Sequence, residues 1–198
     1  MTRLEEGLWR WTTGHPEWKP GGGWEQDVGS VYWEAPDAVV LVDPLVPQDD
    51  AGRQRFLEAL DRDVDRLGHP VHILLTCAWH ERSAAELAER YDAGVRRGAA
   101  DALPAGVAAL EIPCAQETVF WLERAASVVP GDVLLGRREG VELCPSSWLP
   151  KGTKAELARE LRPLLDLPVE RVLVSHGEPV LSDGLAALER ALAGYADA

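Results

Sequence analysis

The sequence predicts an α/β fold in which two mixed β-sheets are flanked by helices. Strand-like runs come first, over residues 27–42, and two strand–loop–helix units follow over residues 72–91 and 171–192. Short apolar runs of the meander type lie between these two units. The 198 residues contain no low-complexity linker and no strong repeat, so we expect one domain over residues 1–198.

In the first half, residues 27–33 (DVGSVYW) and 38–42 (AVVLV) have the composition of strands. The apolar spacing over residues 56–67 predicts an amphipathic helix. Residues 72–76 (HILLT) are typical of a buried strand. Ser83 and Glu86 have the spacing of a capping box, which predicts a helix to about residue 91.

In the second half, residues 107–112, 119–123 and 126–129 predict three strands, and residues 130–132 (PGD) predict a tight turn. A second capping box at Thr153 and Glu156 predicts a helix that ends near Pro163. The last strand is expected at residues 171–175 (RVLVS), and the last helix at 185–192.

Composition excludes several classes of partner. The formal net charge is −13, so phosphate backbones and anionic lipids are repelled, and we expect neither nucleic acid nor membrane as a partner. Three cysteines, an odd number, give no disulfide framework and suit a reducing compartment. No apolar run approaches the length of a membrane span, and we expect a cytoplasmic protein.

Three loops carry polar residues directly after predicted strands: residues 76–82 (TCAWHER), 131–132 (GD) and 175–177 (SHG). In α/β folds this edge of the sheet is where ligands bind. We therefore expect a cleft for a small-molecule ligand at these strand ends.

Together these loops resemble the metallo-β-lactamase superfamily over nearly the whole chain, which implies an αββα sandwich. The family has an early strand that ends in aspartate, here Asp43, and a Gly-Asp turn whose aspartate bridges two metals, here Asp132. It also has a late strand that ends in histidine, here His176.

The metal-binding motifs depart from this family pattern. Against the family's T-H-x-H-x-D-H motif, a cysteine, a tryptophan, a glutamate and an arginine replace the ligands, and His80 falls on a variable position: Cys77, Trp79, Glu81 and Arg82. The family's G-H-[TS] loop corresponds to residues 113–118, which contain Cys114 and no histidine.

Two interpretations follow from this motif. In the first, which we favour, Arg82 takes over the electrostatic role of the metal by pairing with Asp132 or Glu81, and Asp43 holds Arg82 or His176. The protein would then be a non-catalytic or metal-free binding or regulatory protein.

In the second interpretation, His80, Glu81, Asp132 and His176 hold one zinc, iron or manganese ion. Such an ion would lower the pKa of its bound water and supply a hydroxide. The resemblance then implies a divergent hydrolase of an ester, a thioester or a lactone, with His80 and Asp132 as candidate catalytic residues.

A third hypothesis makes Cys77 a nucleophile with His80 as its base, although no orienting group is evident in the sequence. A free cysteine is more often a small buried apolar residue, and we give Cys114 that interpretation. Tryptophans are more often core residues than a binding platform. A hairpin near the N-terminus often overhangs the site in the family, however, so the resemblance implies that Trp18 and Trp24 shape a pocket for an apolar group.

Overall fold

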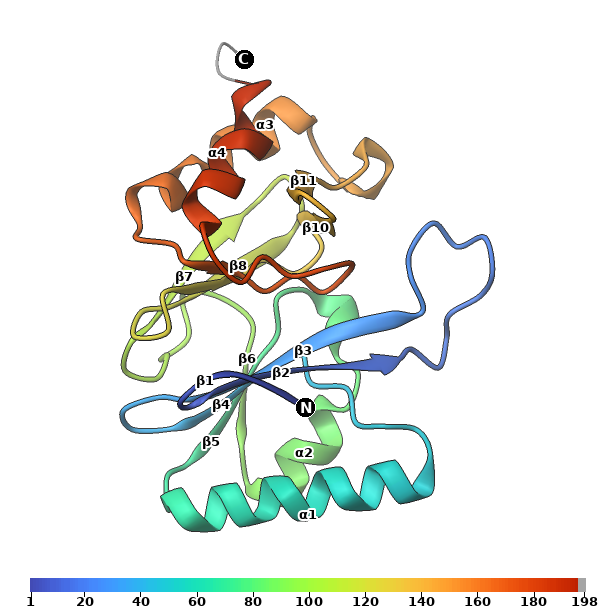
Figure 1. Cartoon of the computed structure of the whole chain (residues 1–198), viewed down its shortest axis with the longest axis vertical. Coiled ribbons are helices and arrows are strands. Elements are labelled where there is room, and N and C mark those ends of the chain that lie inside the picture. Colours follow the sequence, from blue (N-terminus) through green and yellow to red (C-terminus); the bar gives the residue numbers. More distant parts are fainter. Residues whose placement is uncertain (196–198) are drawn as a thin grey trace.

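The computed structural model describes residues 1–195 and shows two β-sheets stacked between two layers of helices (Figure 1). Helices α1 (Asp50–Leu67) and α2 (Ala84–Tyr91) cover the outer face of the first sheet. Helices α3 (Lys154–Leu161) and α4 (Gly184–Ala193) cover the outer face of the second sheet. The predicted αββα sandwich with two mixed sheets is confirmed.

The first sheet has six strands in the order β1-β2-β3-β4-β5-β6. Its first four strands are antiparallel, whereas β4, β5 and β6 are parallel to one another. Parallel strands covered on both faces are uniformly apolar, and β4 (VVLV) is buried at every position. The bounds are β1 Thr2–Glu5, β2 Leu8–Gly14, β3 Asp27–Glu34, β4 Val39–Val42, β5 Val71–Leu74 and β6 Gly94–Arg96.

The second sheet has four strands in the order β12-β9-β8-β7, and a separate ribbon is formed by β10 and β11. Strand β12 is parallel to β9, while the other pairs are antiparallel. The bounds are β7 Val107–Ile112, β8 Glu117–Leu122, β9 Ser127–Val129, β10 Leu134–Arg137, β11 Gly140–Leu143 and β12 Arg171–Val172.

Short 3₁₀ helices connect several of these elements, namely η1 (Ala78–His80), η2 (Ser146–Trp148) and η3 (Arg162–Asp166). Pro163 lies in η3, directly after α3, so that helix ends where the proline predicts. Within residues 1–195, no helix combines the length and the apolar character that a membrane crossing needs.

Three apolar clusters form the core. One lies between the two sheets and includes Val42, Leu74 and Phe120. A second packs the first sheet against α1 and α2, and the third packs the second sheet against α3 and α4. Because both faces of each sheet are covered, the strand ends at one edge remain the place where polar side chains collect.

The structure corrects several sequence predictions. Five strands are absent from the sequence prediction, namely β1, β2, β6, β10 and β11. In β2, tryptophans and glycine mask the alternation of apolar residues, and each of the other four strands has only three or four residues. The last strand is shorter than predicted, since only residues 171–172 belong to β12. Ser83 does precede α2, but its hydroxyl accepts a hydrogen bond from the Val46 amide rather than capping the helix.

The second capping box is present, with reciprocal hydrogen bonds between Thr153 and Glu156 at the start of α3. We expect Thr153→Ala to lower the free energy of unfolding by about 1 kcal/mol, because one helix amide loses its acceptor. Urea denaturation measures the loss, with Thr153→Ser as the control that keeps the cap. An alanine variant as stable as the serine variant would show that the cap contributes nothing.

Candidate functional site

The loops that the sequence predicts to carry chemistry meet at one edge of the two sheets. Asp43 follows β4, residues 76–82 follow β5, Asp132 follows β9 and His176 follows the extended segment after β12. Strands β4 and β5 are parallel, and so are β9 and β12, so each pair delivers its loops to the same edge.

Asp43 organises the bottom of the site. Its carboxylate accepts hydrogen bonds from the Thr76 amide, at 2.9 Å, and from the Thr76 hydroxyl, at 2.6 Å. Its Oδ2 also lies 2.9 Å from Nδ1 of His80. All three side chains are buried, so Asp43 fixes the orientation of the His80 ring and directs Nε2 away from itself.

Asp132 is the point where the other polar side chains meet. Nε2 of His80 and Nε2 of His176 each lie 3.3 Å from Asp132 Oδ1, although neither contact has the geometry of a hydrogen bond. The indole N–H of Trp79 donates to Asp132 Oδ2 at 2.8 Å. The structure therefore brings three of the predicted site residues, His80, Asp132 and His176, into contact.

These contacts shift the acid–base equilibria of the buried groups. Burial alone would lower the pKa of His80, but the carboxylates of Asp43 and Asp132 outweigh it and raise that pKa well above its ordinary value. Burial would raise the pKa of both carboxyls, and the His80 imidazolium lowers it below the ordinary value in each. At neutral pH the site therefore contains an imidazolium between two carboxylates.

Arg82 does not form the ion pair that the sequence predicts. Instead of contacting Asp132 or Glu81, its guanidinium donates to the backbone carbonyls of Gly29 and Asp43, each at 2.9 Å, and to the Ser175 hydroxyl at 2.6 Å. The backbone of Arg82 is left-handed, with φ of 39°, which turns the side chain toward β3. Asp43 thus meets Arg82 only through its carbonyl, while its carboxylate holds His80.

Glu81 lies outside the site and pairs with Arg97 on the surface, with 66% of its side chain exposed. The structure therefore does not bring Glu81 to the other predicted metal ligands, and its neighbour His80 points into the site. The reason is the 3₁₀ turn η1, in which successive side chains point about 120° apart. Trp79, in the same turn, lies at the mouth of the site and is 47% exposed.

The cysteines are buried. Burial raises the pKa of the Cys77 thiol to about 11, so the thiolate that a nucleophile requires is scarce at neutral pH. Asp43 is in position to orient His80 as the base of such a nucleophile. Cys77 does not line the cavity of the site, however, so a ligand there would not meet its thiol. Cys114 is buried in the cluster beneath α3, as expected of a small apolar residue.

Glu117 is a site residue that sequence reasoning missed. Its Oε2 accepts the Asp132 amide at 2.8 Å, and burial together with the Asp132 charge raises its pKa to about 8. The signal was available, since a glutamate opens the apolar strand β8 (ETVFWL), where every residue is buried. A buried carboxyl with a raised pKa is typical of a functional site.

A cavity of about 400 Å³ opens above these residues, within the range of small-molecule sites. His80, Arg82, Glu117, Asp132 and His176 line its inner part. Three tryptophans from separate segments line it as well: Trp24 from the β2–β3 connection, Trp79 from η1 and Trp148 from η2. Trp18 donates its indole N–H to the Trp24 carbonyl, so it supports the wall without lining the cavity.

The residues of this site do not fit a two-metal centre. A cation could take three donors, because Cys77 Sγ, a ring nitrogen of His80 and a carboxylate oxygen of Asp132 lie within 4.8 Å of one another. Asp132 Oδ1 is also buried without a hydrogen bond. Its distance of 3.3 Å from His80 Nε2 is close to the roughly 3.4 Å that separates two donors on one tetrahedral zinc ion. Among the other family positions, His176 could add an imidazole, since its Nε2 lies 3.3 Å from Asp132 Oδ1. The indole of Trp79, the guanidinium of Arg82 and the outward carboxylate of Glu81 add no ligand.

Solved structures similar to this chain share the same fold. The DIM-1 metallo-β-lactamase matches with a TM-score of 0.64 at 12% identity, over 98% of this chain and 95% of that one. A metallo-β-lactamase family protein from Thermus thermophilus matches with a TM-score of 0.57 at 18% identity, over 98% of this chain and 80% of that one. The protein TTHA1623, solved in a di-iron-bound form, matches with a TM-score of 0.56 at 25% identity, over 82% of this chain and 92% of that one.

No protein-family model and no curated protein matches the sequence. The structural matches with DIM-1 and with the Thermus thermophilus protein nevertheless each cover 98% of this chain. The chain has the metallo-β-lactamase fold.

We expect Asp43→Asn to lower the free energy of unfolding by about 3 kcal/mol, because the buried His80 imidazolium loses one of its two carboxylate partners. Urea denaturation measures the loss. Asp61→Asn is the matched control, since Asp61 pairs with Arg90 on the surface and should contribute at most about 1 kcal/mol. Equal losses in the two variants would contradict a buried, charged His80.

Proposed function

We propose that this protein binds a small organic molecule in the cavity beside Asp132 and does so without a metal ion, on a fold whose metal site has been rewritten. It is then a non-catalytic, binding or regulatory protein. The proposal combines a preformed cavity with a site in which His80 already lies between the carboxylates of Asp43 and Asp132.

The single observation that carries the proposal is the hydrogen bond from the Trp79 indole N–H to Asp132 Oδ2. An indole nitrogen in this form donates a hydrogen bond and has no lone pair for a metal. It occupies Oδ2 of that carboxylate, and Trp79 stands at the sequence position where the family pattern has a histidine. A metal bound through both oxygens of Asp132 would have to displace this side chain.

The charge balance of the site supports the same conclusion. His80 and Arg82 contribute two positive charges, and Asp43 and Asp132 contribute two negative charges. A divalent cation added here would meet two fixed cations at short range, and His80 would have to release a proton before it could bind.

We expect protein purified without chelator to contain far less than one equivalent of zinc, iron or manganese, as measured by plasma mass spectrometry. Trp79→His should gain zinc affinity in calorimetry, because it removes the indole and adds an imidazole next to Asp132. Trp148→His is the matched control, since Trp148 lines the cavity without contacting Asp132 by a hydrogen bond. Stoichiometric metal in the parent protein, lost on His176→Ala, would overturn the proposal.

The second candidate is a hydrolase with one metal ion, favoured by the unpaired Oδ1 of Asp132 and the donor set of Cys77, His80 and Asp132. A bound metal ion would supply an activated water for an ester, a thioester or a lactone. Hydrolysis of p-nitrophenyl acetate with added zinc, iron(II) or manganese tests it. Turnover that requires one of these ions and is lost in His80→Ala would favour the hydrolase over the binding protein.

Binding itself is tested by ligand-observed NMR of a fragment library in the presence of chelator. We expect fragments that bind the parent protein and Trp9→Leu but lose affinity in Trp79→Leu, because Trp9 packs on Tyr32 away from the cavity. The absence of any binding fragment, or binding that survives in Trp79→Leu, would count against the cavity as the site.

A further inference from the structure

The walls of the cavity define which chemical class of ligand it takes. Three indoles line it, and they belong to the connection between β2 and β3, to η1 and to η2. Trp24 and Trp148 both pack edge-to-face with His176, with ring centroids 5.4 Å and 6.0 Å apart. These contacts hold two of the indoles against the same imidazole, so the aromatic wall is built before a ligand arrives.

The basic groups of the inner part already have partners within the protein. His80 lies between the carboxylates of Asp43 and Asp132, at 2.9 Å and 3.3 Å. The Arg82 guanidinium donates to two backbone carbonyls and to the Ser175 hydroxyl. These groups are therefore engaged within the protein rather than directed at a ligand.

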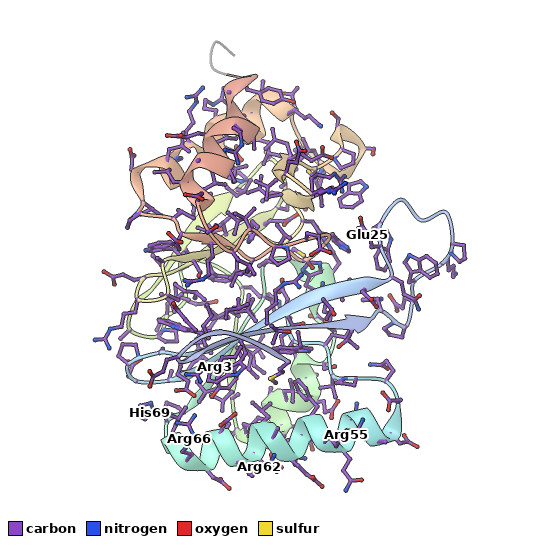
Figure 2. All side chains as sticks on the ribbon, in the orientation of Figure 1. Arg3, Glu25, Arg55, Arg62, Arg66 and His69 are labelled. Carbon is purple, nitrogen blue, oxygen red and sulfur yellow. The ribbon has the colours of Figure 1, made fainter. Side chains whose placement is uncertain are left out.

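The unbalanced charge lies at the entrance. Glu17 lines the cavity and is exposed, and Glu25 extends to within 4.0 Å of His176 Nδ1. Figure 2 shows Glu25 at the base of the long β2–β3 connection. His15 also lines the cavity, but burial and the nearby Arg82 charge lower its pKa, which leaves it neutral at pH 7.

One arginine approaches this entrance without neutralising it. Arg137 lies 3.8 Å from Glu25, but its guanidinium donates to Glu142 at the shorter distance of 2.7 Å. Arg137 is therefore shared between Glu25 and Glu142, while Glu17 lines the cavity separately. The entrance keeps an excess of negative charge beside the aromatic wall.

We infer that the ligand is a small organic cation, an ammonium group on an apolar or aromatic body. This inference rests on the proposed function, since it names the ligand class of the same cavity. Indole rings attract organic cations through the negative charge of their faces, and carboxylates at the entrance add to that attraction. The net charge of −13 acts in the same direction at long range.

The test uses three probes of nearly the same shape and different charge: phenethylammonium, phenethyl alcohol and phenylacetate. Isothermal titration calorimetry with chelator present should show the ammonium ion binding about tenfold more tightly than the alcohol. Phenylacetate should bind most weakly, because it meets the entrance carboxylates with the same sign of charge.

The double variant Glu17→Gln/Glu25→Gln should lose most of the preference for the ammonium ion and leave alcohol binding unchanged. Glu89→Gln/Glu189→Gln is the matched control, because it removes the same formal charge from exposed positions on α2 and α4. In this control the preference for the ammonium ion should persist. A preference lost equally in both pairs would assign the effect to overall charge and overturn the inference.

Failure of this inference is distinct from failure of the proposed function. Tightest binding by phenylacetate or by the alcohol would overturn the cationic ligand while leaving a metal-free binding cavity in place. If the fragment library binds and none of the three probes does, the inference is also wrong. If neither the library nor the probes bind, both the inference and the proposed function fall.

Discussion

One buried interaction governs the arrangement of this site, namely the contact of the His80 ring with Asp43 on one side and Asp132 on the other. Asp43 comes from the end of a strand in the first sheet and Asp132 from the end of a strand in the second. The imidazole therefore links the two halves of the sandwich at the place where they meet. The other polar contacts of the site are arranged around this line, with Thr76 below it and Trp79 above it.

The position of the tryptophan follows from this arrangement. Because His80 faces Asp132 Oδ1, the second oxygen of that carboxylate is left to accept the hydrogen bond from the Trp79 indole N–H. A large apolar ring can then lie half in solvent without losing its polar contact, as tryptophan often does at binding surfaces. The cavity consequently has aromatic walls at its opening and charged groups beneath them.

The fold class was predictable because it depends on patterns that survive in the sequence. Buried parallel strands such as β4 are continuous apolar runs, and Asp43, Asp132 and His176 stand directly after strand-like segments. Strand β2 was missed because its tryptophans and the glycine-rich segment after it hide the alternation between buried and exposed positions.

The orientation of side chains in the first motif was harder to predict. Whether His80 or Glu81 enters the site depends on one short 3₁₀ turn, and a shift of one residue rotates the side chain by about 120°. The partner of Arg82 depends on its left-handed backbone, which no residue pattern encodes. The Arg82 guanidinium has five N–H donors, and backbone carbonyls can accept their hydrogen bonds as well as carboxylates can. The charge of Arg82 alone therefore did not identify its contacts.

The contacts of Arg82 have a consequence for the kinetics of folding. Its guanidinium joins Gly29 in the first sheet to Ser175 beside the second, a cross-link supplied by the polypeptide itself. Gly29 and Ser175 are far apart in the sequence, so this link requires a large loop to close first. Contacts of this kind slow folding, because the loop-closure entropy is lost before they stabilise the chain.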